Sequence, residues 1–123
     1  MILADSSIWI DHLKSQDEIL ASLLEQERIV THPFVIGEIA LGNLRQRAVV
    51  LDALHKLPQA IVARDAEVLT LIENAALSGL GIGYIDAHLL ASVKLTDEVR
   101  LWSRDKRLIA AAARLDLAAA VLN

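Results

Sequence analysis

Short apolar runs alternate along the chain with longer segments in which apolar residues recur at helical spacing. The apolar run 2–4 is too short for a helix and predicts a buried strand. The segment 28–31 predicts a second strand, and 98–103, which contains Val99, Leu101 and Trp102, predicts a third buried strand. A weaker fourth strand is predicted at 118–122. The periodic segments between the strands predict helices. The first starts after a cap at Ser6 or Ser7, and the third runs from Pro33 to Gly42-Asn43. The others are predicted at 17–26 and at about 46–57, 65–78, 84–95 and 106–115.

This order of elements is typical of an α/β fold. Strands that alternate with helices form βαβ units, so we expect a central, mainly parallel sheet of about four to five strands flanked by helices. No linker rich in proline, glycine or serine divides the 123 residues, and the length suits one domain over 1–123. The longest apolar region, 75–93, contains three glycines, Asp86 and His88, so it is not expected to span a membrane.

The amino-acid composition excludes several classes of protein and of functional site. Hydrophobic residues make up 54% of the chain, which excludes a disordered protein, and the absence of cysteine excludes disulfides, thiolate zinc sites and cysteine nucleophiles. Aromatic residues make up only 3%, which argues against a platform for stacking nucleobases. A net charge of -4 argues mildly against a nucleic-acid partner. The N-terminal segment has no basic leader, so a cytoplasmic protein is expected.

Some of the sixteen acidic residues lie in apolar surroundings. On a helix, the neighbours three and four positions from Glu38 are all apolar, and the same is true of Asp86. We therefore expect both carboxylates on helix faces that point inward. Glu73 has nearly the same surroundings, so this pattern alone does not identify a site.

Two further acids lie at strand ends. Asp5 ends the first predicted strand and Asp105 follows the third, and the carboxyl ends of parallel strands meet at one edge of a sheet. The alternative role for Asp5 is a helix N-cap, which Ser6 or Ser7 can already provide. Carboxylates about 5 Å apart repel by roughly 3 kcal/mol per pair at an effective dielectric of 20, so a cluster needs protons or cations. A set of oxygen ligands suits Mg²⁺ or Mn²⁺.

Four segments that contain these acids follow one another in a familiar order. They are Asp5-Ser6-Ser7, the stretch Pro33-Phe34-Val35-Ile36-Gly37-Glu38, Tyr84-Ile85-Asp86-Ala87-His88-Leu89-Leu90-Ala91, and Leu101-Trp102-Ser103-Arg104-Asp105-Lys106-Arg107-Leu108. Together they resemble the PIN-domain ribonucleases and, within these, the VapC toxins of bacterial toxin–antitoxin pairs. The resemblance covers essentially the whole chain and implies a PIN-like three-layer fold.

The resemblance also implies an active site. The implied activity is that of an endoribonuclease in which water activated by Mg²⁺ or Mn²⁺, one or two ions per site, attacks a phosphodiester. Ser103 takes the place of a hydroxyl residue that is commonly threonine, and Ser7 matches a small hydroxyl residue that orients the first acid. Arg107 stands where some relatives carry a further acid, which bears on a second metal ion. The implied metal ligands and catalytic acids are Asp5, Glu38, Asp86 and Asp105.

Basic residues beside these motifs are candidate RNA contacts. Arg104 and Lys106 adjoin the fourth acid, and Arg45 lies just beyond the Glu38 helix. Contacts of this kind with phosphates set position and affinity but not sequence choice. The alternative is a solvated role at helix ends, where cations are favoured, and this applies also to Arg47 and Arg107.

The same resemblance implies the partners. A VapC-like protein pairs with a VapB-like antitoxin whose tail covers the acidic cleft, and family members usually form homodimers. Aliphatic residues on the helices at 17–26 and 46–57 are candidate surfaces for either contact, with a core role as the alternative. No residue indicates which RNA is cut.

Two other classes of function stay open at this point. One is a catalytically inactive PIN-like binding protein, against which the complete set of four acids argues. The other is a Mg²⁺-dependent phosphotransfer domain with Asp5 as the nucleophile. Phosphatases of the haloacid-dehalogenase type need a second aspartate two positions later, where this chain has Ser7.

Overall fold

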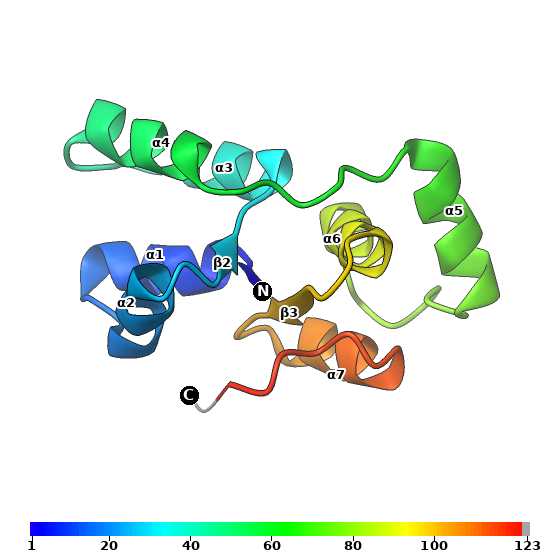
Figure 1. Cartoon of the computed structure of the whole chain (residues 1–123). Coiled ribbons are helices and arrows are strands. Elements are labelled where there is room, and N and C mark those ends of the chain that lie inside the picture. Colours follow the sequence, from blue (N-terminus) through cyan, green and yellow to red (C-terminus); the bar gives the residue numbers. More distant parts are fainter. Residues whose placement is uncertain (122–123) are drawn as a thin grey trace.

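The computed structural model describes residues 1–121, and it places seven helices of that part of the chain around a small parallel sheet (Figure 1). The strands lie in the order β2-β1-β3, so the first strand is central. Ile2 of β1 pairs with Ile29 of β2 and with Arg100 of β3. In chain order the elements are β1 (Ile2–Ala4), α1 (Ser6–Lys14), α2 (Glu18–Glu25), β2 (Ile29–Val30), α3 (Pro33–Ala40), α4 (Arg47–Lys56), α5 (Asp65–Asn74), α6 (Tyr84–Leu95), β3 (Arg100–Trp102) and α7 (Lys106–Arg114).

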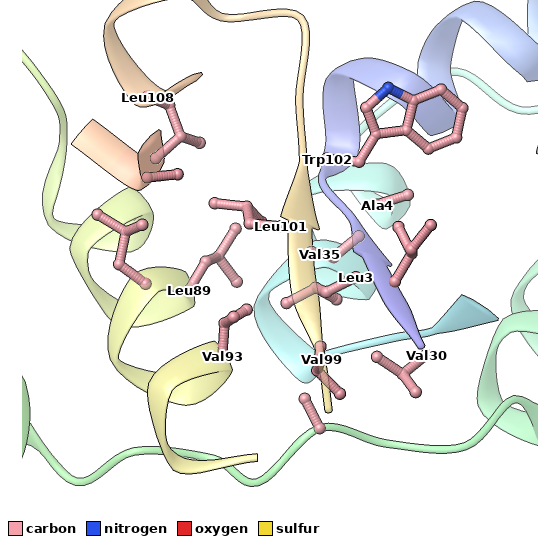
Figure 2. Close-up of a cluster of buried hydrophobic side chains, with 14 of the residues drawn as sticks. Leu3, Ala4, Val30, Val35, Leu89, Val93, Val99, Leu101, Trp102 and Leu108 are labelled. Carbon is pink, nitrogen blue, oxygen red and sulfur yellow. The ribbon is translucent and has the colours of Figure 1, made fainter. Parts of the chain in front are cut away.

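The sheet is covered on both faces, as expected for a parallel sheet whose strands alternate with helices. Figure 2 shows Leu101 of β3 on the side of α6, near Leu89, and Trp102 on the opposite side. Leu3 of the central strand is completely buried. Helix α6 lies between the sheet and α5 (Figure 1), and its residues 87–93 are all buried. Even so, none of the helices described in residues 1–121 is long and apolar enough to cross a membrane.

The sheet has three strands in the described residues, fewer than the four to five expected. The segment predicted as a final strand at 118–122 forms only a single parallel bridge, between Ala118 and Leu101, and residue 122 lies outside the described residues. In β3 the backbone groups of Arg100 and Trp102 face β1, where they bond Met1 and Asp5. Only Leu101 therefore presents its N–H and carbonyl to the C-terminal segment, at 2.7 and 2.8 Å.

Most predicted helices agree with the structure within two residues. The exception is the helix predicted at 65–78, which ends at Asn74. Ala76 adopts the left-handed conformation with φ 52°, and the Leu77 N–H donates to the Ile72 carbonyl at 3.0 Å. This is a Schellman ending, which glycine usually signals in a sequence. Here alanine occupies the left-handed position, so the apolar periodicity continued past the true end of the helix.

Candidate active site

The four acids of the predicted site come from elements that meet at the carboxyl edge of the sheet. Asp5 directly follows β1, and Asp105 follows β3, which is parallel to β1. Helix α6 packs on β3 and leads into its start, so the first turn of α6, with Asp86, lies towards the opposite, carboxyl edge. Helix α3, which carries Glu38, begins just beyond the end of β2.

Asp5 is almost completely buried, and hydroxyl groups hold both of its carboxylate oxygens. Its Oδ1 accepts hydrogen bonds from the Ser7 backbone N–H at 3.0 Å and from the Ser7 hydroxyl. Its Oδ2 accepts a bond from the Ser103 hydroxyl at 2.6 Å. Asp5 is thus the N-cap of α1, which corrects the prediction of a cap at Ser6 or Ser7. The capping role fixes the carboxylate in place at the end of β1.

The other two acids at helix starts are also held by backbone bonds. Asp105 caps α7, and its Oδ1 accepts from the N–H groups of Arg107 and Leu108 at 2.9 and 3.3 Å. Asp86 is half-buried, and its Oδ2 accepts from the Gly83 N–H at 3.2 Å. The N-terminal ends of three helices therefore point towards carboxylates. Helix dipoles favour negative charge at these ends, which helps to stabilise the acids in one region.

The carboxylates are close enough for their charges to interact. Burial raises the pKa of Glu38. A hydrogen bond from Ser6 lowers this pKa, and the charges of Asp86 and Asp5 raise it further. Burial also raises the pKa of Asp86, where the bond from Gly83 opposes the charges of Asp105 and Asp5. Each of the four acids thus takes part in at least one repulsive interaction with another. The structure brings the four predicted residues into one electrostatic cluster.

The donor set of this cluster fits a hard divalent cation. As the side chains stand, no group of three or more histidine, aspartate or glutamate residues in 1–121 forms a cage ready to hold a metal ion. Mg²⁺ does not require one, because it usually keeps several waters and binds through one or two carboxylates. The cluster offers only carboxylate oxygens, which matches that preference. Burial is the main cause of the raised pKa values of Glu38 and Asp86, and a cation would also offset the repulsion between carboxylates that adds to it.

The basic residues predicted to contact RNA differ in their surroundings. The guanidinium of Arg104 forms ion pairs with Asp11 and Asp17, at 2.5 Å each, so it links the β3–α7 connection to α1 and α2. These partners account for its position without RNA, and a phosphate contact by Arg104 stays a prediction. Lys106 is exposed and lines a hollow of about 330 Å³. Arg45 is exposed in a larger hollow of about 630 Å³ beside α1.

Arg47 lies at a helix end, the role that the sequence offered as the alternative to an RNA contact. Its guanidinium donates to the carbonyls of Ala40 and Gly42, and so it binds the carboxyl end of α3. Glu73, which had nearly the same sequence surroundings as Glu38 and Asp86, is exposed on α5. It takes no part in the acid cluster and provides a natural control residue.

A cluster of aromatic and histidine rings beside the acids was not predicted. The ring of His88 packs edge-to-face against Phe34 and against Tyr84, with centroid distances of 4.8 Å in both pairs. Asp65, at the start of α5, accepts hydrogen bonds from the Tyr84 hydroxyl and from His88, each at 3.0 Å. The sequence contained one indication of this cluster, because Phe34 lies four residues before Glu38, on the same helix face.

The chain is similar to known proteins. Residues 2–114 match the PIN domain, and the chain belongs to this family. It is also similar to the protein named Ribonuclease VapC32 in two strains of Mycobacterium tuberculosis. The identity is 49% over 120 residues, which cover 98% of this chain and 97% of the relative. The predicted membership of the PIN-domain family, on the VapC branch, is confirmed.

Proposed function

We propose that this protein is a Mg²⁺- or Mn²⁺-dependent endoribonuclease that acts as the toxin of a VapBC-type toxin–antitoxin pair. The observation that carries the proposal is the cluster of four acids at the carboxyl edge of the sheet, in a chain 49% identical to a protein named as a ribonuclease. The proposed reaction is attack of water on an RNA phosphodiester.

The residues of the cluster have separate parts in this proposal. Asp5, Glu38, Asp86 and Asp105 would hold one or two cations. When bound, the cation would lower the pKa of a water molecule and offset negative charge on the phosphodiester. Ser103 and Ser7 hold the Asp5 carboxylate in a fixed orientation through the bonds at its two oxygens. A fixed ligand reduces the reorganisation needed when the site is loaded, which supports catalysis.

The overall negative charge is compatible with RNA as the substrate. The chain has sixteen acidic and twelve basic residues, so twelve of each remain when the four site acids are set aside. Lys106 and Arg45 are exposed and available for phosphate contacts. Each such contact adds affinity that falls with salt, by a slope of about 0.7 per neutralised phosphate on a single strand.

A VapB-like antitoxin is the proposed partner, in the cytoplasm, and a homodimer is the proposed assembly. The hollow beside α1 is lined by Ile10, Leu13 and Val50 together with Arg45 and Lys14, among others, so it offers both apolar and cationic side chains. Leu41, at the end of α3, is 90% exposed. We propose that the antitoxin covers these residues and places a cation at the acids. Cleavage that is unchanged by saturating antitoxin would contradict this.

The test of the enzymatic proposal is a cleavage assay on purified protein with structured RNA. We expect cleavage to stop in EDTA, to return with Mg²⁺ or Mn²⁺, and to be absent in Asp5→Asn. Glu73→Gln, which changes an exposed acid outside the cluster, should cleave like the wild type. Binding of RNA without cleavage under all these conditions would favour the inactive binding protein, and a covalent phosphate on Asp5, detected by mass spectrometry, would favour phosphotransfer.

A further inference from the structure

The few aromatic residues of the chain are divided between its interior and the acid site. Trp9 and Trp102 are buried, with 5% and 3% of their surface exposed. Phe34 is half-buried, and Tyr84 is 47% exposed. The two aromatic rings that reach the surface are therefore those in the cluster around His88. Low aromatic content argued against a stacking platform, but it gave no information on where the remaining rings lie.

The Tyr84 ring is held in place although it is exposed. Its hydroxyl donates to Asp65 Oδ1 at 3.0 Å, and its ring meets His88 edge-to-face with an interplanar angle of 89°. His88 is itself fixed, because it is only 3% exposed, packs against Phe34 and bonds the same carboxylate oxygen. Since a carboxylate only accepts, His88 Nε2 carries the proton of that bond. Tyr84 is thus anchored on the side of His88 and Asp65, and about half of its surface remains open.

This ring cluster borders the carboxylates. Tyr84 and Asp86 both lie in the first turn of α6 but point to different faces, so the link to the acids runs through Phe34, which packs on His88 as Tyr84 does. Phe34 lies one turn before Glu38 on α3, and residues four apart occupy the same helix face. Both helices begin at the carboxyl edge of the sheet, where Asp5 and Asp105 also lie. A nucleotide with its phosphodiester at the acids would therefore place a neighbouring base within reach of the Tyr84 ring.

We propose that Tyr84, supported by Phe34 and His88, stacks against a nucleobase next to the phosphodiester that is cut. The proposal rests on the proposed function and adds a substrate contact to it. Stacking on an aromatic ring is tolerant of base identity, so Tyr84 would add affinity and position without selecting a sequence. A ring that is already held by its hydroxyl and by His88 loses little freedom on binding, which favours this use.

Binding of a single-stranded RNA that carries 2-aminopurine tests the proposal in EDTA, because stacking quenches this base without any cleavage. We expect the wild type to quench it and Tyr84→Leu to bind about 5- to 150-fold more weakly, the range for one base–aromatic stack. Tyr84→Phe loses the bond to Asp65 but keeps the ring, so it should bind within about threefold of the wild type. Tyr84→Trp should bind at least as tightly as the wild type. Leu69→Ala, at an exposed apolar residue of α5, is the matched control and should have no effect.

The outcomes separate stacking from a structural role and from the proposed function. A structural role through Asp65 would make Tyr84→Phe as damaging as Tyr84→Leu, and this result would overturn the proposal. Equal quenching by Tyr84→Leu and the wild type would overturn it as well. With Mg²⁺, Tyr84→Leu should raise KM with little change in kcat, as expected for a contact made equally in the ground and transition states. Failure of the wild type to cut RNA would instead contradict the proposed function, while the quenching result would still stand.

Discussion

The Ser103 hydroxyl donates a hydrogen bond to Asp5 Oδ2 at 2.6 Å, across 98 positions of sequence. Ser103 Oγ in turn accepts a hydrogen bond from the Asp105 N–H at 3.0 Å. One buried hydroxyl therefore connects the ends of β1 and β3 and fixes the first acid of the cluster relative to the fourth. On the other side of Asp5, the Ser7 hydroxyl bonds its Oδ1 and accepts from the Arg104 N–H at 3.1 Å.

Two substitutions of Ser103 should distinguish the effect of its hydroxyl group from the effect of its side-chain size. Ser103→Ala leaves Asp5 Oδ2 and the Asp105 N–H without this partner, and we expect a loss of about 1–3 kcal/mol in the free energy of unfolding. RNA cleavage should fall at least tenfold, because the first acid loses its orientation. Ser103→Thr keeps the hydroxyl and should retain most of the cleavage. Urea unfolding and cleavage rates measure both effects, and equal activity in Ala and Thr variants would contradict this role.

Removal of charge from the cluster should stabilise the metal-free protein. The pKa of Asp86 is raised, mainly by burial, so its charged form is disfavoured in the folded state. The folded protein then holds its proton more tightly than the unfolded chain, and stability falls as the pH rises through the ordinary value of 3.8 towards the raised one. At pH 7 in EDTA, Asp86→Asn should therefore increase Tm by a few degrees.

The Asp86→Asn variant keeps an oxygen that can accept the bond from Gly83, so the start of α6 is preserved. Glu73→Gln is the control and should leave Tm unchanged, since Glu73 is exposed and outside the cluster. A lower Tm for Asp86→Asn, measured in EDTA, would show that the charge of Asp86 does not destabilise the folded protein.

Protonation of His32 should destabilise the fold in mild acid. Burial lowers the pKa of His32 to about 4, and His88 acts in the same direction. The unfolded chain takes up this proton near the ordinary value of 6.5, so stability present above pH 6.5 is lost as the pH falls towards 4. The loss should reach at most about 3 kcal/mol. Chemical denaturation between pH 7 and 5 measures it.

His32→Asn is the variant that tests this assignment. His32 Nδ1 accepts from the Phe34 N–H at 3.0 Å and Nε2 bonds Ser92 at 3.0 Å, so the neutral ring caps α3 and joins it to α6. Asparagine can replace the cap. We expect the variant to be less stable at pH 7 but to lose less stability on acidification. His55→Asn, at an exposed position of α4, should keep the wild-type pH dependence.

Arg104 and Lys106 should respond differently to substitution. Arg104→Ala breaks the ion pairs to Asp11 and Asp17 and should lower stability by about 1 kcal/mol, because these pairs are partly exposed. Lys106→Ala changes an exposed side chain and should leave stability nearly unaltered. It should weaken RNA binding and reduce the salt slope by about 0.7. Fluorescence anisotropy at several salt concentrations measures the slope, and an unchanged slope would remove Lys106 from the RNA contacts.

The sequence predicted the parts of the fold that depend on local patterns. Helix α6 has the predicted bounds, because apolar periodicity and the glycines before it define both ends. The predicted end of α5 was wrong, because nothing in the sequence indicates that Ala76 adopts the left-handed conformation. The fourth strand was reduced to a bridge because pairing depends on how many backbone groups of β3 face outward, which is a tertiary property.

The four acids that interact in the structure were predicted as a set from the sequence, but the contacts around them were not. Neighbour patterns alone could not separate Glu38 from Glu73, which differ in exposure only because α3 and α5 occupy different places in the fold. The resemblance supplied that distinction. Neither the neighbour patterns nor the resemblance could show that Asp11 and Asp17 hold Arg104, or that Tyr84 and His88 share Asp65. These contacts join segments that are distant in sequence.

Calorimetric titration of the metal-free protein with Mn²⁺ tests the cation site most directly, because it needs neither RNA nor antitoxin. We predict one or two binding events in the wild type, at least tenfold weaker binding in Asp86→Asn and Glu38→Gln, and wild-type binding in Glu73→Gln. Wild-type Mn²⁺ affinity in both cluster variants, or loss of binding in Glu73→Gln alone, would contradict the assignment of the four carboxylates as the metal site.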